Sequence, residues 1–301
     1  MKNLFSKHRA VDSWLFALVP PHALALFRIF FGMFLLILWL RRLPFLPYLF
    51  ANGRILPPLL DEGIPSFLSP FPVPPSPEIA CLLYIIFLSF LVFFILGFYT
   101  RTSAFVSFLF SLYYWFLAMR LVEATYDRLF IIFLFILSFS GAGMTLSWTM
   151  RHRHGSWWAW EPIVVFPQRL IAIQVTMTYL GSGWQKAWLP GWQTGEVIYY
   201  MLIGMRSTRF AHFIAALPLS FYFYEVMSGI VKLFEFILPV GLWSKSQRWF
   251  FLGGAIFHIL VTCVIGMWWF LALIATYILF IDPEKVFMWF EKRFPTPAPL
   301  R

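Results

Sequence analysis

Long apolar segments alternate with short polar segments along nearly the whole chain. A helix needs about 20 mostly apolar residues to cross a bilayer. Segments of that kind lie at residues 22–40, 79–98, 103–119, 129–147, 163–183, 222–242, 249–266 and 267–281. The pattern therefore predicts an all-α protein, a polytopic transmembrane helical bundle of about eight spans.

The segments between the predicted spans differ in length. Two of them, 43–78 and 184–221, are too long for simple turns, and we expect them to fold back against the bundle with short interfacial helices at 55–62 and 194–215. Residues 1–20 lack a clear signal-peptide cleavage site and predict an interfacial helix. We expect a single domain over 1–301, with 282–301 as a tail.

Composition agrees with a lipid environment. Hydrophobic residues make up 61% of the chain and charged residues 12%, whereas soluble domains average about 45–50% and about 25%. The formal charge of +10 lies mostly in short segments between the predicted spans. This placement indicates contact with membrane lipids, with no nucleic acid as a partner.

Lysine and arginine predict the orientation of the chain. With the N-terminus inside, cytoplasmic segments hold twelve of these residues and external segments hold eight. By the positive-inside rule, both termini and the 282–301 tail are cytoplasmic, and 43–78 and 184–221 are external. From the small size and the lack of an organelle signal, we expect a multi-pass protein of a bacterial cytoplasmic (inner) membrane.

Polar residues inside predicted spans are costly and are the most informative feature. Five of them follow one helical stripe in 163–183 and just beyond it: Arg169, Thr176, Tyr179, Gly183 and Lys186. One interpretation is a polar groove leading to a lysine that acts as a base. The other is a lysine that extends from a helix end to the interface.

A second stripe occupies the span 222–242, with Glu225, Ser228, Lys232 and Glu235 at helical spacing. Glu235 can pair with Lys232 one turn away, or it can face a cavity and orient another group. His258 and Arg28 stand alone in apolar spans. His258 is either a packing residue or an acid-base group, and Arg28 either reaches the interface or holds an anion or a headgroup.

Other site chemistries lack a motif. The RHRH run at 151–154 precedes three tryptophans and predicts an interface anchor. The chain has no metal-ligand pattern of the HExxH kind, no Walker loop, no GxGxxG and no GxSxG. Cys81 and Cys263 lie in apolar spans outside any CxxC, and we expect buried free thiols, with a disulfide as the alternative.

The stretch Tyr179–Gly195, YLGSGWQKAWLPGWQTG, resembles the signature of the HTTM family, the membrane domain shared with vitamin K-dependent gamma-carboxylases. Three further stretches fit this family in order: LALFRIFFG, FEFILP and HILVTCVIGMWWF. The resemblance covers residues 15–285. It implies that Lys186 is the base that deprotonates a vitamin K-like quinol, and it implies no metal.

The resemblance also suggests the surroundings of this lysine. Glu235 and His258 would support Lys186, and Tyr179, Trp184 and Trp192 would flank a quinone ring. Together with Arg28, these aromatic residues and Tyr126 form the set of candidate substrate-binding residues.

Two departures from the carboxylases weaken the transfer of their activity. Residues 124–127 read Ala-Thr-Tyr-Asp where the carboxylases have an Asn-His pair, and this chain ends soon after its last predicted span. If the protein is an enzyme, the resemblance implies a lyase of the carboxylase or quinol-epoxidase type. The alternative is a non-catalytic membrane partner that helps to mature or export a secreted peptide. A secondary transporter is a third hypothesis, but the inverted repeats typical of that class are not evident.

Overall fold

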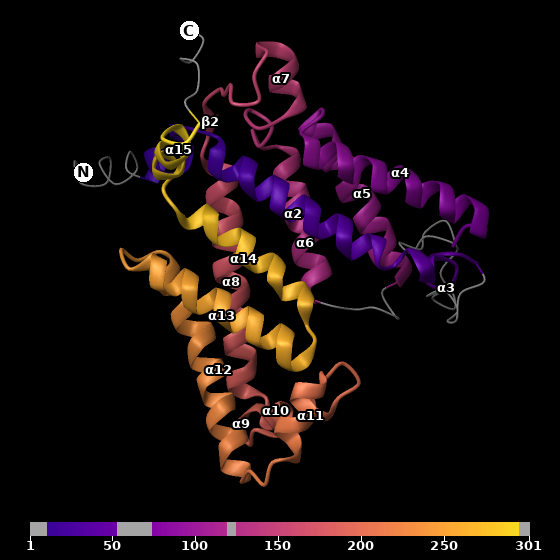
Figure 1. The fold of residues 1–301 in the computed structure, drawn as a ribbon, viewed down its shortest axis with the longest axis vertical. Coiled ribbons are helices and arrows are strands. Elements are labelled where there is room, and N and C mark those ends of the chain that lie inside the picture. The colour runs from indigo at the N-terminus through magenta and orange to yellow at the C-terminus, as the bar shows by residue number, and fades with distance from the viewer. Residues whose placement is uncertain (1–10, 53–73, 119–124, 295–301) are drawn as a thin grey trace, which may run out of the picture. The chain divides into compact units, whose positions relative to one another are not determined.

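The computed structural model describes residues 11–52, 74–118 and 125–294, and these are almost entirely helical (Figure 1). Their strand content is one short antiparallel pair, β1 (Leu18–Val19) with β2 (Ile163–Val164). The chain divides into two compact units. Unit 1 comprises 1–168 and 281–301, and unit 2 comprises 169–280. The sequence pattern predicts a single domain and does not anticipate this division.

Unit 1 is built on the first four predicted spans. Its helical elements are α2 (His22–Leu40), η1 (Leu43–Phe45), α3 (Leu46–Phe50), α4 (Pro77–Leu96), α5 (Thr100–Ala118), α6 (Thr125–Ser138), α7 (Trp148–His154) and α15 (Pro283–Glu291). Helix α2 packs on α4 and α15, and α5 packs on α4 and α6.

Aromatic rings fill the core of unit 1. Phe50 lies 4.7 Å from Tyr114 between ring centroids, and Trp39 lies 4.9 Å from Phe87 in an edge-to-face arrangement. Edge-to-face and offset pairs of this kind are the favoured aromatic geometries. The high Phe and Trp content of the sequence therefore serves packing within this unit.

The predicted span 129–147 is longer than the helix found there. Helix α6 ends at Ser138, and residues 141–147 form an irregular turn. Gly143 lies against Thr100, so close that a Cβ atom at this position would collide with the threonine side chain. The small residues of this turn let it fold back onto α5, which ends the helix early.

Unit 2 contains most of α8 (Phe166–Trp188), which begins in unit 1. Its other elements are α9 (Pro190–Gln193), α10 (Glu196–Ile203), α11 (Arg209–Ala216), α12 (Phe221–Leu242), α13 (Gln247–Ile265), η2 (Trp268–Phe270), α14 (Leu271–Thr276) and η3 (Tyr277–Phe280). Helix α12 packs on α9, α10 and α13, and α13 packs on α11 and α14.

The structure corrects one predicted element in unit 2. The helix expected over 194–215 is two helices, because the chain leaves α10 at Gly204 and starts α11 after Thr208. The Thr208 hydroxyl accepts a hydrogen bond from the backbone N–H of Ala211 at 3.3 Å and so caps α11. The helix predicted at 55–62 lies outside the described residues. Of 1–20, residues 11–20 are described, and 11–16 are helical.

Three helical stretches among the described residues are long and apolar enough to cross a membrane: His22–Phe50, Pro77–Leu96 and Gln247–Ile265. Three is fewer than the eight spans that the sequence pattern predicts. The other predicted spans overlap helical segments that are shorter or more polar. Helix α6 has 14 residues, and α12 carries Glu225, Lys232 and Glu235. The structure thus bears out an all-helical protein with apolar, membrane-type helices.

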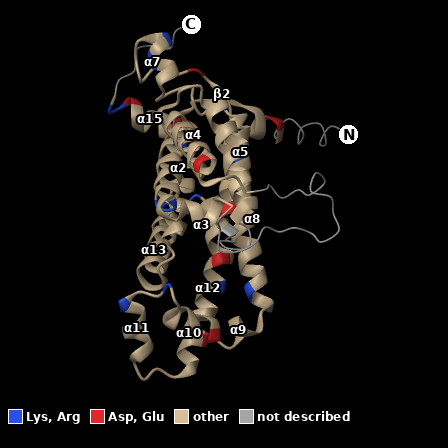
Figure 2. Cartoon of the chain, turned by 90° about the vertical axis from the view of Figure 1, so that its right-hand side faces the viewer, with Lys and Arg blue, Asp and Glu red and all other residues tan. Residues whose placement is uncertain are grey.

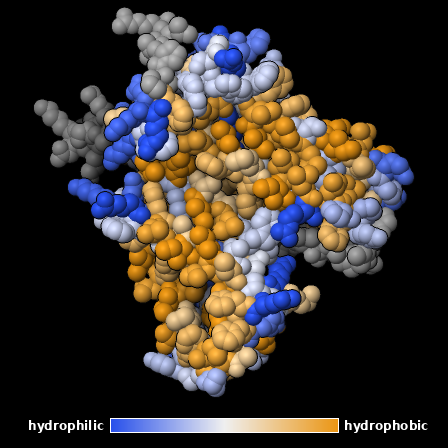
Figure 3. Space-filling view, in the orientation of Figure 1, coloured by the Kyte–Doolittle hydropathy of each residue, from blue (hydrophilic) through white to orange (hydrophobic). Residues whose placement is uncertain are grey.

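Large apolar side chains cover much of the face shown in Figure 3. Cys81 and Cys263 are both free and exposed. The prediction that their thiols are buried is therefore wrong. Each lies on the outward side of an apolar helix, where neighbouring helices do not cover it.

Candidate functional site

The polar stripe on α8 meets other helices of unit 2 at successive turns. The Trp243 indole donates to the Thr176 hydroxyl at 2.9 Å, and the Arg169 guanidinium lies 5.9 Å from the Trp243 ring centroid. Tyr179 and Lys186 follow further along α8 and contact α13 and α12. Since residues three, four and seven apart share one helix face, the stripe is the inward face of α8.

Lys186 and Glu235 form an ion pair between α8 and α12. The Lys186 ammonium donates to Glu235 Oε1 and, at 2.8 Å, to the Ser182 hydroxyl one turn back on α8. The side chains are 18% and 8% exposed. Two opposite charges this well shielded from water form a net neutral unit, which removes much of the cost of burying either one.

Gly183 sets the approach of α8 to α12 at this pair. A Cβ atom at this position would lie 3.2 Å from the Phe236 ring and 3.4 Å from the Glu235 Cβ. Any larger side chain would push the two helices apart. The glycine of the YLGSG stretch therefore brings the lysine within reach of the carboxylate.

Trp192 covers the lysine. Its ring centroid lies 5.0 Å from the Lys186 Nζ, within the range of a cation–π contact. Two donors on α12 hold the Trp192 carbonyl: the Ser228 hydroxyl at 2.5 Å and the Lys232 ammonium at 3.0 Å. The second polar stripe thus positions the aromatic ring that shields Lys186.

Gly195 turns the chain from α9 into α10. Its φ of +78° is left-handed, and a Cβ atom there would collide with the backbone of α12 at Tyr224 and Glu225. Only glycine meets both conditions without strain. The last residue of the GWQTG motif is therefore required by the path of the backbone.

The Tyr179 hydroxyl joins two partners further along unit 2. It lies 2.5 Å from His258 Nε2 on α13 and 2.9 Å from the Tyr277 hydroxyl. His258 is 2% exposed, and both tyrosines are buried. Gly254 makes room for this cluster, since a Cβ atom there would lie 2.5 Å from the Tyr277 oxygen.

Two buried atoms in these groups have no hydrogen-bond partner among the described residues. They are Glu235 Oε2 and His258 Nδ1. Buried polar atoms are normally bonded. An unbonded carboxylate oxygen next to a lysine can accept a proton or a hydrogen bond from a molecule that enters the site.

The three predicted catalytic residues, Lys186, Glu235 and His258, thus all lie in unit 2. Lys186 belongs to the α8 stripe, and Glu235 and His258 each form a polar contact with a residue of that stripe. Charged residues are few along the helices (Figure 2). The choice between partners for Glu235 is settled, because it binds Lys186 while Lys232 binds the Trp192 carbonyl. Trp184 is 61% exposed and packs edge-on against Trp188, 5.6 Å away between centroids. Trp184 therefore points outward, and Trp192 is the ring that meets Lys186.

Arg28 lies in unit 1 and is completely buried. Its guanidinium donates to the backbone carbonyls of Ala142 at 2.8 Å and Leu146 at 2.5 Å. It reaches neither the interface nor, among these contacts, an anion. Through these hydrogen bonds the arginine holds the irregular turn 141–147 against α2.

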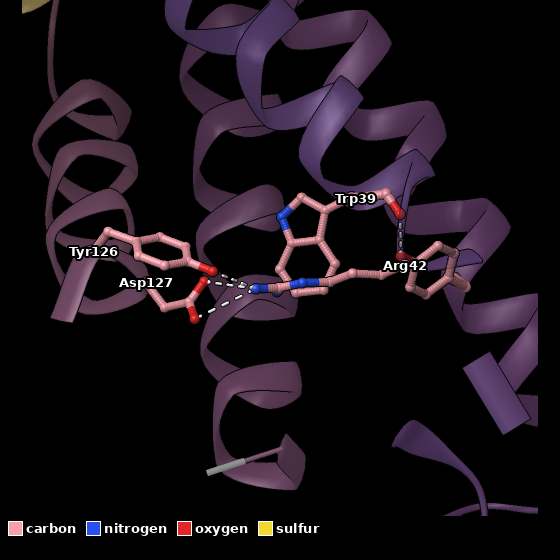
Figure 4. Close-up of polar contacts among 5 residues, drawn as sticks. Trp39, Arg42, Tyr126 and Asp127 are labelled. Atoms are coloured by element: carbon pink, nitrogen blue, oxygen red, sulfur yellow. Dashed lines mark hydrogen bonds and ion pairs between the residues drawn. The ribbon is translucent and has the colours of Figure 1, made fainter. Parts of the chain in front are cut away.

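Tyr126 also lies in unit 1, beside an ion pair. The Arg42 guanidinium donates to Asp127 at 3.1 Å and to the Tyr126 hydroxyl at 3.4 Å (Figure 4). The same guanidinium lies 4.5 Å from the Trp39 ring centroid. Tyr126 is thus part of a second polar group in unit 1.

Sequence reasoning missed several of these residues. Ser182 precedes Lys186 by four residues, so helical spacing could have identified it. Tyr277 and the Arg42–Asp127 pair have no local signal, because their partners are distant in the chain. No group of three or more potential metal ligands occurs in the described parts of the chain. Comparisons with protein-family models, curated proteins and solved structures found no match to this sequence.

Proposed function

We propose that this chain is an HTTM-type, multi-pass membrane protein in which Lys186 and Glu235 transfer a proton to and from a lipid-phase substrate. The substrate class we propose is a quinol, following the resemblance of YLGSGWQKAWLPGWQTG to the carboxylase membrane domain. The observation that carries the proposal is the Lys186–Glu235 ion pair, shielded by Trp192, with Glu235 Oε2 buried and unbonded.

The ion pair supplies both a proton acceptor and a charge. Lys186 hands a proton to Glu235 across their hydrogen bond, which leaves a lone pair on Nζ. Nζ then takes the proton of the substrate hydroxyl, whose O–H electron pair stays on the substrate oxygen. The ammonium so formed lies next to that oxygen and stabilises its charge, an effect that is larger where water is excluded.

The aromatic and polar neighbours have supporting roles. Trp192 limits access of water to Nζ and offers a face to a flat ring. The free lone pairs of Glu235 Oε2 suit a hydroxyl donor. Tyr179 lies on the same face of α8 as Lys186, seven residues earlier, which corresponds to about 10 Å along the helix. Its hydrogen bond to His258 on α13 positions the two helices. At that distance neither side chain touches the substrate hydroxyl that Lys186 binds.

The membrane part of the proposal includes about eight spans, cytoplasmic termini and a bacterial inner membrane. Support comes from the three apolar helices that meet the length and hydropathy needed to cross a bilayer. The other predicted spans overlap helical segments of the described chain in part. Lys186 of α8 and Glu235 of α12 neutralise each other, which lowers the cost of placing these two charges in lipid.

The test begins with purified protein in nanodiscs. Lipids that co-purify with wild type, Lys186→Ala and Lys245→Ala are extracted and identified by mass spectrometry. Lys245 is an exposed lysine between α12 and α13 and serves as the matched control. We expect a quinone or another defined lipid in wild type and Lys245→Ala, and its loss in Lys186→Ala. Bulk phospholipid alone in all three would remove the basis of the quinol proposal.

A second measurement separates catalysis from a structural role. Vitamin K hydroquinone is added to the nanodiscs in air-saturated buffer, where dissolved dioxygen is the oxidant, and its oxidation is followed by absorbance for wild type, Lys186→Arg and Lys186→Ala. Arginine keeps the charge but does not give up its proton, so Lys186→Arg should lose turnover. A fully active Lys186→Arg would contradict the base role and would favour the non-catalytic peptide-maturation hypothesis.

A further inference from the structure

Unit 1 contains a small pocket that the proposed function does not use. It lies between the end of α2, the end of α5 and the start of α6. Its lining is Leu35, Leu38, Trp39, Arg42, Ser111, Tyr114, Trp115, Ala118, Asp127, Phe130 and Ile131. The pocket itself has room for about one water-sized group. Figure 4 shows Arg42, Trp39 and Asp127, three of the residues that line it.

Three side chains on α5 bring unused hydrogen-bond donors to this pocket. They are the Ser111 hydroxyl, the Tyr114 hydroxyl and the Trp115 indole N–H, and each is buried without a partner among the described residues. Tyr114 is 1% exposed and Ser111 is 5% exposed. Leaving a buried donor unbonded costs about 1–3 kcal/mol. Three such donors on one lining indicate that an acceptor binds between them.

The charges that line the pocket do not favour an anion. Arg42 is the cation of the lining, and Asp127 neutralises it at 3.1 Å. The guanidinium also lies over the Trp39 ring. The polar groups that remain without a partner are two hydroxyls and an indole N–H, which suit an uncharged acceptor. A carbonyl oxygen has two lone pairs and can accept from two of them at once, and water is the alternative occupant, because the two hydroxyls also accept hydrogen bonds.

The predicted depth of the pocket in the membrane indicates which kind of molecule supplies the carbonyl. The pocket lies at the end of the predicted span 22–40 and the start of 129–147, so it belongs to the boundary between hydrocarbon and headgroups. The acyl esters of phospholipids lie at this boundary. The pocket has room for the carbonyl oxygen and not for the acyl chain, which would continue outside it, and the lining residues Leu35, Leu38, Phe130 and Ile131 are apolar, as suits this boundary.

We propose that this pocket binds the acyl-ester carbonyl of a membrane phospholipid through Ser111, Tyr114 and Trp115. The site is separate from Lys186 and holds a lipid in place without chemistry. A quinone carbonyl has the same acceptor chemistry, so the test must distinguish the two sources.

The test compares two bilayers that differ in the carbonyl alone. Wild type and Tyr114→Phe are placed in nanodiscs of an ester-linked phosphatidylcholine and of its ether-linked analogue, and the Tm is measured by far-UV circular dichroism. Wild type should be more stable in the ester lipid by about 2 °C or more. Tyr114→Phe should lower the Tm in the ester lipid and remove the difference between the lipids.

The direction of the Tyr114→Phe effect is decisive. If the pocket is empty, removing an unbonded hydroxyl is neutral or stabilising, and if it holds only water, Tyr114→Phe lowers the Tm equally in the two lipids. A variant as stable as wild type in the ester lipid would therefore overturn the proposal. Ser111→Ala is a second variant with little change of shape and should act in the same direction.

Two controls complete the design. Tyr113→Phe removes a neighbouring hydroxyl on α5 that does not line the pocket, and it should keep the ester-minus-ether difference. Lys186→Ala should also keep it, so that a failure of the quinol proposal and a failure of this one are separable. If added menaquinone restores the lost stability in the ether lipid, the carbonyl belongs to a quinone and the ester assignment is wrong.

Discussion

Arg28 in unit 1 and Lys186 in unit 2 are both cations within predicted spans, yet they are held in different ways. Arg28 is wholly buried, and its two terminal nitrogens donate to the backbone carbonyls of Ala142 and Leu146. Lys186 is 18% exposed, and its charge meets that of Glu235. Arg28 therefore holds a turn in place, whereas Lys186 has a carboxylate partner, on which the proposed proton transfer depends.

The two units also bury their apolar helices to different extents. In the N-terminal stretch His22–Phe50 of unit 1, 56% of the most apolar window is buried by the protein, whereas in α13 of unit 2 the share is 11%. Unit 2 has aromatic contacts of its own, such as Phe234 with Phe257 at 4.5 Å between ring centroids. One of its buried clusters comprises Leu202, Ala211 and Tyr224.

The largest expected effect is at Arg28. Arg28→Met keeps much of the volume but leaves two buried carbonyls unbonded, so we expect a loss of about 3 kcal/mol or more in the free energy of unfolding. Unfolding in mixed micelles, followed by far-UV circular dichroism, measures it. Arg153→Met, at an exposed position of α7, is the control and should be close to wild type. A stable Arg28→Met would show that the turn 141–147 does not depend on the arginine.

Removal of either partner of the ion pair should have the next largest effect. Lys186→Met or Glu235→Leu leaves an uncompensated charge with little exposure, at an expected cost of about 2 kcal/mol each. The double variant should be more stable than either single variant, because no charge remains. A double-mutant cycle by the same unfolding assay gives the coupling. Strictly additive single effects would mean that the pair does not form in the membrane.

Two glycines of α8 provide a matched pair for helix packing. Gly183 contacts Phe236 and Glu235 on α12, whereas a Cβ atom at Gly181 would meet nothing within 4 Å. Gly181→Ala should be neutral or stabilising by up to about 1 kcal/mol from helix propensity. Gly183→Ala should be less stable than Gly181→Ala by about 1–2 kcal/mol through overpacking. Equal stability of the two variants would contradict the close approach of α8 and α12.

The smallest expected effect is at the tyrosine pair. Tyr179 bonds both His258 and Tyr277, and Tyr277 bonds Tyr179. Hydrogen bonds between membrane helices average about 0.6 kcal/mol. Tyr179→Phe should therefore destabilise by about 1 kcal/mol and Tyr277→Phe by about half as much, measured in parallel unfolding experiments. A larger loss of stability in Tyr277→Phe than in Tyr179→Phe would contradict the assignment of two hydrogen bonds to the Tyr179 hydroxyl and one to the Tyr277 hydroxyl.

Much of the helical framework was predictable from the sequence, because hydrophobic length and helical spacing are local properties. The apolar segment 22–40 coincides with α2, and the spacing from Arg169 to Lys186 correctly placed those residues on one face of α8. The same local reasoning failed at 141–147 and at Gly204, where close packing or a backbone turn interrupts a helix.

The sequence by itself determined the all-helical class, the apolar character of the helices and the identity of Lys186, Glu235 and His258 as polar groups in apolar surroundings. Only the tertiary structure decided which groups meet. Glu235 pairs with Lys186 and not with Lys232, His258 meets Tyr179, and Arg28 binds carbonyls more than one hundred residues away. The physical reason is that helix geometry fixes which face a residue occupies, whereas its partner depends on how closely two helices approach, as Gly183 permits for α8 and α12.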